Sequence, residues 1–256
     1  MAMTTFKTRG LVLREYEAGE SDKRIVLLCK GHGRITAYAR GARKVKSKFL
    51  AATQLFTYGD YVIADGRQFF SMSQAQIIES FYPIRQDYDK LCFAQYILEI
   101  CEKTVPGGSA SAGSGSYGGC DELLRLALKT LQHISGDSIQ GLQAVQVFLF
   151  RFFLFSGLAP EMDLCSICNC VLDNSVMFCD EGMVCSSCQS QGTLASSNKI
   201  SLPLSAAAKE AIRHILLSDL NNAFMFSVQD SVLKELASAS QLCWRGHFSF
   251  DLRTEI

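Results

Sequence analysis

Four cysteines form two closely spaced pairs in the second half of the chain. Cys165 and Cys168 are separated by two residues, and after 16 intervening residues Cys185 and Cys188 repeat the same spacing. Two such pairs can supply four thiolates to one zinc ion in a tetrahedron. Four thiolates leave no open position for a reacting water, so we expect one structural zinc ion per chain that stabilises the fold.

Two further cysteines leave the ligand set open. Cys170 and Cys179 lie between the pairs, and either could replace one of the four ligands. The alternatives to a metal site are two redox dithiols or unrelated core cysteines. Six of the 11 cysteines fall between Cys165 and Cys188, and this clustering favours the metal. The chain begins without an apolar leader, which predicts a reducing cytoplasmic location rather than a disulfide framework.

A second group of residues suggests nucleic-acid binding. Between residues 34 and 48 six cations occur without one acid, namely Arg34, Arg40, Arg43, Lys44, Lys46 and Lys48. If residues 34–40 form a strand, its period of two places Arg34, Thr36, Tyr38 and Arg40 on one face and the small apolar residues on the other. Cations can bind phosphates and a tyrosine ring can stack on a base. We therefore expect these six cations and Tyr38 to bind DNA, with residues 41–48 as a flexible basic loop; the alternative is a solvated charged surface.

The charge distribution agrees with a specialised basic portion. The 256 residues carry 25 basic and 25 acidic side chains, so the formal net charge is zero. The first 80 residues nevertheless hold 13 basic against 7 acidic residues. No run of about 18 apolar residues occurs, so no membrane span is expected.

The pattern of apolar residues divides the chain into a β-rich and a helical part. Short apolar or alternating runs occur at 10–14, 24–29, 34–40, 54–58, 61–64 and 69–72, and they predict about five strands, the size of a small barrel, with a hairpin turn at Gly31–Gly33. Helical periodicity follows near 88–101, 123–131, 139–155, 205–217 and 228–244.

These elements predict an α+β protein with two domains. An N-terminal OB-fold β-barrel occupies residues 1–81, and an α-helical domain occupies 82–256, with the four-cysteine zinc module inserted at about 163–190. Residues 106–119 contain 6 Gly and 4 Ser and predict a flexible, poorly ordered loop. A small hairpin is expected between the two cysteine pairs.

No recognised catalytic motif accompanies these features. The sequence lacks a phosphate-binding P-loop, H-E-x-x-H and G-x-S-x-G, and its four histidines are scattered singly. A zinc deaminase acting on nucleic acid would need an H-x-E motif before its cysteine pair, which is also missing. We therefore expect a binding protein rather than an enzyme, and a zinc-ribbon OB-fold protein that binds RNA is the main alternative.

Arg151 is the remaining polar residue of interest. It lies between Phe150 and Phe152 in an almost wholly apolar helix, so its charge needs a partner. The partner is expected to be an internal carboxylate or an acidic group on another protein.

Several of these segments together resemble the bacterial RecO family of recombination mediators. The similarity is carried by RGLVL at 9–13, YEAGESD at 16–22, ARGARK at 39–44 and FRFFLFSGLAP at 150–160, followed by the two cysteine pairs. The Gly/Ser segment departs from the family pattern, and residues after 195 match it only in helical character.

The resemblance implies a function that the residues alone do not give. It implies a DNA repair and recombination protein that binds single- and double-stranded DNA, anneals complementary strands and helps to load the recombinase onto protein-coated single strands. The implied partners are RecR, the acidic C-terminal tail of single-strand binding protein, with Arg151 as the candidate contact, and indirectly the RecA filament. The implied location is the cytoplasm, in association with the nucleoid.

Overall fold

The computed structural model describes residues 4–66, 69–107, 120–172, 177–190, 200–250 and 252. The chain forms two compact units, one reaching from the N-terminus to Ser138 and the other spanning Ile139–Asp251, and each is described by itself. Most of the Gly/Ser segment predicted at 106–119 lies outside the described residues.

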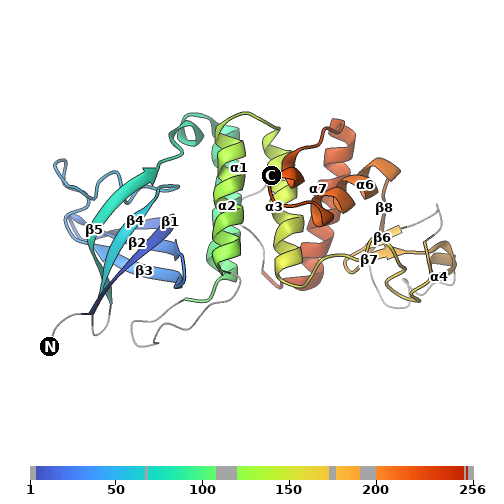
Figure 1. Cartoon of the computed structure of the whole chain (residues 1–256), viewed down its shortest axis with the longest axis horizontal. Helices are drawn as coiled ribbons and strands as arrows, with labels where there is room; N and C mark the ends of the chain where they lie inside the picture. The colour runs from blue at the N-terminus through green and yellow to red at the C-terminus, as the bar shows by residue number, and fades with distance from the viewer. Residues whose placement is uncertain are drawn as a thin grey trace. The chain divides into compact units, whose positions relative to one another are not determined.

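The first unit contains a closed five-stranded barrel, as the sequence predicts. Its strands are β1 (Thr4–Ala18), β2 (Asp22–Cys29), β3 (Gly33–Ala39), β4 (Tyr58–Asp65) and β5 (Phe70–Glu79), arranged in the order β1-β2-β3-β5-β4 (Figure 1). The pairing of β3 with β5 is parallel and the other four pairings are antiparallel. This closed arrangement of five strands is OB-like.

One predicted strand is wrong. Residues 54–57 form turns, and β4 begins only at Tyr58. Phe56 has a positive φ of 68°, which an extended strand does not allow. Its backbone N–H donates to the Val12 carbonyl at 3.2 Å, and its side chain is fully buried.

Helices cover part of the outer surface of the barrel. Ile25, Leu27 and Cys29 of β2 belong to the barrel core, while Val26 and Leu28 on the opposite face are also buried. The outer cover comes from α1 (Tyr88–Thr104) and α2 (Cys120–Ser135), which contact β1 and β2. A 3₁₀ helix, η1 (Tyr82–Gln86), precedes α1. The Asp87 carboxylate begins α1 by accepting the Lys90 N–H at 3.0 Å.

Three longer helices form the core of the second unit. They are α3 (Gly141–Phe155), α6 (Ala206–Leu217) and α7 (Asp230–His247). The short 3₁₀ helix η2 (Asn222–Phe224) lies between α6 and α7 in the sequence. The apolar helix α3 contacts both α6 and α7, which explains why it is buried almost all round. Ser205 begins α6, because its hydroxyl accepts the Ala208 N–H at 3.2 Å.

The cysteine-rich module of this unit is built on a small sheet. The expected hairpin consists of β6 (Met177–Cys179) and β7 (Gly182–Val184), and β8 (Leu202–Pro203) pairs with β6. The short helix α4 (Ser186–Ser190) follows β7. Among the described helices, none combines the length and the apolar character needed to cross a bilayer.

Candidate functional site

Three of the four predicted cysteine ligands come together, and the fourth member of their cluster, Cys170, is a residue that the two-pair pattern did not select. One sulfur atom from each of Cys165, Cys168, Cys170 and Cys185 lies within 4.8 Å of the other three. Cys168 Sγ is 3.3 Å from Cys170 Sγ and 3.7 Å from Cys185 Sγ. The chain therefore presents a four-cysteine cluster that could bind a metal ion.

Local backbone hydrogen bonds aim these thiols at one point. The Cys165 N–H donates to the Cys170 carbonyl, and the Asn169 N–H donates to the Cys165 carbonyl, both at 2.9 Å. Asn169 has a φ of 57°, so this tight turn requires the left-handed conformation that asparagine tolerates. The hairpin then delivers Cys185 from the end of β7.

Cys188 lies beside the cluster, and Cys179 does not belong to it. The Cys188 N–H donates to Cys185 Sγ at 3.5 Å, and the Cys188 thiol also interacts with those of Cys165 and Cys168. Cys179 is fully buried with its sulfur 3.7 Å from the Ser166 hydroxyl. Five thiols thus surround a position that needs four.

The polar surroundings favour the thiolate, the form that binds metal, at Cys165 but not at Cys170. Burial alone would raise the pKa of Cys165, but backbone N–H groups, including that of Cys185, outweigh it and lower this pKa to about 6. Contact with the Cys168 and Cys185 thiols raises the pKa of Cys170 to about 12. A cluster of soft sulfur donors, two of which, Cys165 and Cys185, have a lowered pKa, fits a thiophilic ion.

The basic run is more ordered than the flexible loop expected from the sequence. Successive turns bond Lys44 N–H to the Gly41 carbonyl and Ser47 N–H to the Lys44 carbonyl. The Asp22 carboxylate accepts the Gly41 N–H at 2.7 Å, and this hydrogen bond lowers the pKa of Asp22. Ala42 and Phe49 anchor the segment in the barrel core.

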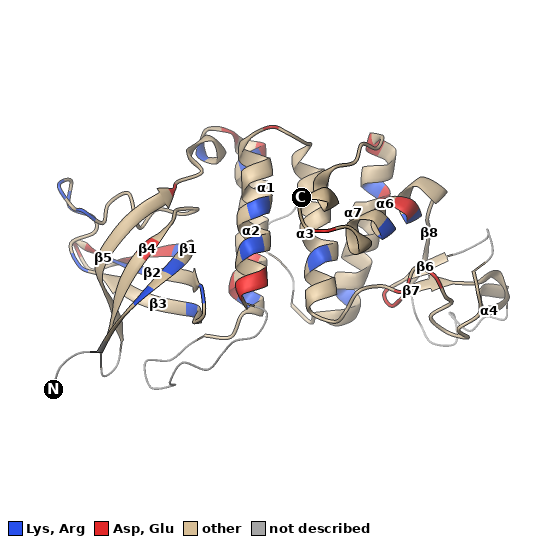
Figure 2. Cartoon of the chain, viewed as in Figure 1, with Lys and Arg blue, Asp and Glu red and all other residues tan. Residues whose placement is uncertain are grey.

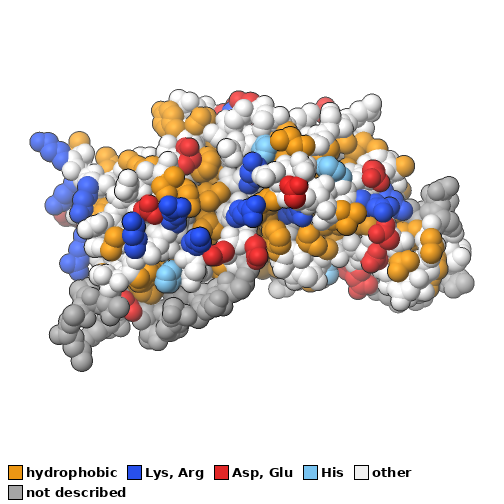
Figure 3. Space-filling model, in the orientation of Figure 1, with side chains coloured by type: hydrophobic (Ala, Val, Ile, Leu, Met, Phe, Trp, Pro, Cys, Tyr) orange, Lys and Arg blue, Asp and Glu red, His pale blue; other side chains and the backbone are white. Residues whose placement is uncertain are grey.

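Two of the six predicted cations, Arg40 and Lys44, interact electrostatically with the Asp22 carboxylate. Arg40, Lys44 and Lys46 are exposed, and no carboxylate of the described residues forms a recorded ion pair with them. Arg43 pairs with Glu17 at 3.0 Å, and Lys48 donates to the Ser73 carbonyl at 3.2 Å. Figure 2 marks the Lys and Arg positions along the turns that follow β3, and Figure 3 shows Lys and Arg side chains gathered at that end of the barrel. We call residues 40–48 the basic segment.

Arg34 is directed away from the basic segment. The strand alternation is as predicted, with Ile35 and Ala37 inside the barrel and Arg34 outside. The guanidinium of Arg34, however, donates to the backbone carbonyl of Glu102 near the end of α1. This internal bond is a correction to its assignment as a DNA contact.

Tyr38 belongs to a row of side chains across three strands. It lies opposite Arg24 of β2, which in turn lies opposite Tyr16 of β1. The Arg24 guanidinium carbon is 4.6 Å from the Tyr16 ring centroid, and the Tyr38 ring meets Phe69 edge-on at 5.3 Å. Sequence reasoning missed the other three members, because only the strand register brings them beside Tyr38. We call these four residues the aromatic row.

Arg151 has a different partner from the expected carboxylate. It is 6% exposed and donates to the backbone carbonyls of Leu216 and Ser218 at the end of α6. Burial lowers its pKa, while the nearby Asp219 opposes this effect. The side chain thus stabilises a helix C-terminus, and its placement gives no support to a partner contact.

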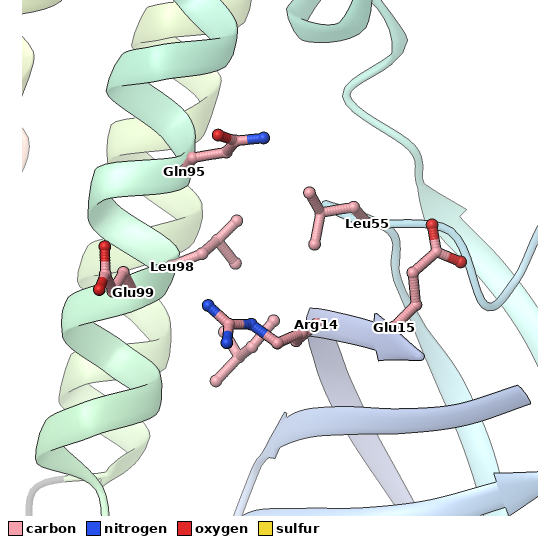
Figure 4. Close-up of a pocket in the computed structure, with 7 residues that line it drawn as sticks. Arg14, Glu15, Leu55, Gln95, Leu98 and Glu99 are labelled. Atoms are coloured by element: carbon pink, nitrogen blue, oxygen red, sulfur yellow. The ribbon is translucent and has the colours of Figure 1, made fainter. Parts of the chain in front are cut away.

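A cavity of about 420 Å³ lies between β1 and α1 in the first unit (Figure 4). Its charged lining residues have partners: Arg14 pairs with Glu102 at 3.0 Å, and Glu99 with Lys103 at 2.9 Å. A hydrogen bond to the Tyr16 hydroxyl is the main cause that raises the pKa of Arg14. None of the described lining residues is a Ser, Cys or His that could act as a nucleophile.

The barrel, the helices and the cysteine cluster together define an OB-like protein with a candidate metal module. Two family models match the chain, Recombination protein O N terminal over residues 3–81 and Recombination protein O C terminal over residues 85–254. This chain belongs to the RecO family of DNA repair and recombination proteins.

Curated relatives agree with this assignment. The chain is 33% identical over 243 residues to the DNA repair protein RecO of Acetivibrio thermocellus, which covers 93% of this chain and 90% of that protein. It is 30% identical over 235 residues to the protein of the same name from Bacillus pumilus, covering 90% and 84%. Neither the family descriptions nor these names specify a catalytic activity.

Proposed function

We propose that this protein is a DNA-binding recombination mediator without catalytic activity of its own. It binds single- and double-stranded DNA, anneals complementary strands and helps to load the recombinase onto protein-coated single strands. Family membership supports this function, and one feature of the chain supports it independently. The side chains of Arg40, Lys44 and Lys46 are exposed on a segment held by turn hydrogen bonds, and none of them forms an ion pair within the described residues.

These cations suit a polyanion better than a small ligand. Phosphate contacts need exposed positive charges and no particular base, and each contact releases counterions. The basic segment keeps a net positive charge, because its five cations outnumber the two carboxylates beside it, those of Asp22 and Glu17. Turns bonded to the barrel keep the three cations together in the absence of ligand, which limits the entropy lost on binding.

The cysteine cluster is proposed to hold one structural zinc ion. Zinc with four sulfur ligands at about 2.3 Å would place the sulfur atoms about 3.8 Å apart. The 3.7 Å between the Cys168 and Cys185 sulfurs fits this separation, whereas the 3.3 Å between Cys168 and Cys170 is shorter. Cys165, Cys168 and Cys185 belong both to the predicted ligand set and to the cluster, and we propose Cys188 as the fourth ligand, with Cys170 as the alternative.

In this role the ion would join segments of the module that have little core of their own. The first pair of cysteines lies in a turn, and the second pair spans the end of β7 and the start of α4. The protein residues supply thiolates and backbone N–H groups that stabilise their charge.

The partners implied by the family are RecR, the acidic tail of single-strand binding protein and indirectly the RecA filament.

An annealing assay tests the proposed function. Complementary DNA strands coated with single-strand binding protein are mixed with this protein without ATP, and duplex formation is followed by fluorescence. We expect annealing by the parent and a strong loss in the triple variant Arg40→Gln, Lys44→Gln, Lys46→Gln. A control with the same charge change uses the exposed residues Arg125, Lys234 and Arg245 and should anneal normally.

The same assay separates the alternatives. No annealing by the folded parent protein would contradict the mediator function. Tighter binding to RNA than to a DNA strand of the same sequence would favour an OB-fold RNA-binding protein, because OB folds accept either nucleic acid.

A further inference from the structure

The outer surface of the barrel is covered at one end of the strands and open at the other. Along β2, Leu28 and Val26 point outward and are buried under the helices of the same unit. Arg24, the next outward residue, is exposed. The surface therefore changes from an apolar packing face to an open face within one strand.

The aromatic row, Tyr16, Arg24, Tyr38 and Phe69, lies on this open face. In an antiparallel pair, directly opposite residues project to the same side of the sheet, so the register places Tyr16, Arg24 and Tyr38 side by side. Phe69 extends the row from the β4–β5 connection and is 60% exposed. Tyr16 and Tyr38 are partly exposed on this face, so part of each side chain remains open to solvent.

Internal contacts hold the row in place without covering it. The Arg14 guanidinium donates to the Tyr16 hydroxyl at 3.4 Å, and Arg14 is itself paired with Glu102 of α1. The edge-on contact with Phe69 supports the Tyr38 ring. Within the described residues no carboxylate forms an ion pair with Arg24, and its exposed guanidinium lies over the Tyr16 ring.

The basic segment is tied directly to the same end of the barrel. Arg43 pairs with Glu17, next to Tyr16, and the Arg43 N–H donates to the Ser21 carbonyl at 2.9 Å in the turn before β2. Phosphate-binding cations and aromatic rings therefore adjoin one another along the β1–β2 turn. A nucleic acid bound by the segment has a path across the row.

We propose that the aromatic row stacks unpaired bases and gives the barrel a preference for single-stranded over duplex DNA. This inference rests on the proposed DNA-binding function and names the form of DNA that the open face takes. Rings and a planar guanidinium offer flat surfaces to a base, and base stacking accepts any base. In a duplex the base faces are already stacked, so duplex DNA reaches only the cations.

The basic segment and the aromatic row would therefore make two different kinds of contact with DNA. The basic segment serves both forms of DNA through phosphates, and the aromatic row adds affinity only for single strands. In a mediator this difference would retain the separated strands until they pair and would weaken the contact once a duplex has formed.

The test compares binding to three ligands of equal length by fluorescence anisotropy. They are a single-stranded oligonucleotide, the same strand with abasic sites, and the duplex. Tyr38→Ala should weaken binding to the single strand about 5- to 150-fold, the range that corresponds to one stacked base. Binding to the duplex and to the abasic strand should change less than twofold.

Two further variants act as controls. Tyr38→Phe retains the ring and should bind the single strand like the parent. Tyr82→Ala removes a ring that is 58% exposed but lies outside the row, and it should have no effect. Arg24→Ala and Phe69→Ala should reproduce the selective loss for the single strand.

The outcomes separate this inference from the function on which it rests. If the triple variant of Arg40, Lys44 and Lys46 loses both forms of DNA while Tyr38→Ala binds normally, the DNA-binding function stands and the stacking inference is wrong. Equal losses of Tyr38→Ala on single-stranded, abasic and duplex DNA would also overturn it. If neither variant changes DNA binding, both proposals fail.

Discussion

The guanidinium of Arg34 donates a hydrogen bond to the backbone carbonyl of Glu102, close to the C-terminal end of α1. A cation near a helix C-terminus interacts favourably with the carbonyl dipoles there. This contact joins the barrel to a helix of the same unit. Arg34 is thus bonded within the fold, whereas Arg40, six residues further along the chain, is exposed.

Replacing Arg34 should therefore affect stability rather than DNA binding. Arg34→Ala removes a charged hydrogen bond and should lower the free energy of unfolding by about 1 to 3 kcal/mol. Arg40→Ala should leave stability nearly unchanged and weaken DNA binding. Urea unfolding and anisotropy titrations measure the two effects, and the reverse pattern would return Arg34 to the DNA surface.

The salt dependence of DNA binding should identify the phosphate contacts. Each lost contact should reduce the slope of log affinity against log salt by about 0.7 to 0.9. The triple variant of Arg40, Lys44 and Lys46 should thus lose about 2 to 3 units of slope and bind all sequences more weakly to a similar degree. The control variant of Arg125, Lys234 and Arg245 should keep the slope of the parent. If the Arg40, Lys44 and Lys46 variant keeps it as well, the DNA binds at another surface.

The metal content of cysteine variants should decide which four thiols bind. We expect about one zinc per chain in the parent and a severe loss of stability in Cys168→Ser, since structural zinc contributes roughly 10 to 16 kcal/mol of apparent binding free energy in small modules. Cys188→Ser should lose the ion and Cys170→Ser should retain it. Elemental analysis measures this, and the opposite result for the last two variants would make Cys170 the fourth ligand.

Arg151 should act as an internal stabiliser. Arg151→Ala leaves the Leu216 and Ser218 carbonyls without their donor, and unfolding should become easier by about 1 to 3 kcal/mol. Because the side chain is buried, an acidic peptide ending in Phe should bind the folded variant as it binds the parent. A selective loss of peptide affinity in the folded variant would show that the side chain becomes accessible to a partner.

The contribution of Asp22 to stability should depend on pH. The Gly41 N–H is the main cause of its lowered pKa, with smaller contributions that include Arg40 and Lys44. A carboxylate whose pKa falls on folding stabilises the protein above its unfolded-state pKa, and this stabilisation disappears as pH falls through the folded-state value. Asp22→Asn should therefore lower Tm at pH 7, and the difference should shrink below about pH 4. A difference in Tm that stays constant from pH 7 to pH 3 would show that ionisation of Asp22 is not involved.

Local patterns in the sequence were sufficient for many elements of the fold. Alternation predicted that Ile35 and Ala37 face the barrel core, and periodicity predicted the apolar helix that became α3. The hairpin between the cysteine pairs was also predicted correctly. These features depend on residues that are close in sequence, so side-chain type and spacing determine them.

Long-range contacts decided the role of each candidate site residue. Arg34 and Arg40 have the same charge and the same strand parity, but α1 covers only the end of the strand that carries Arg34. Arg24 and Tyr16 became neighbours of Tyr38 through the register of three strands, which no local pattern specifies. Sequence spacing determined that thiols would cluster, whereas the packing of two turns brought Cys170 within reach of the others. The chemistry that a residue can perform is local, but its partners are set by contacts between segments far apart in the chain.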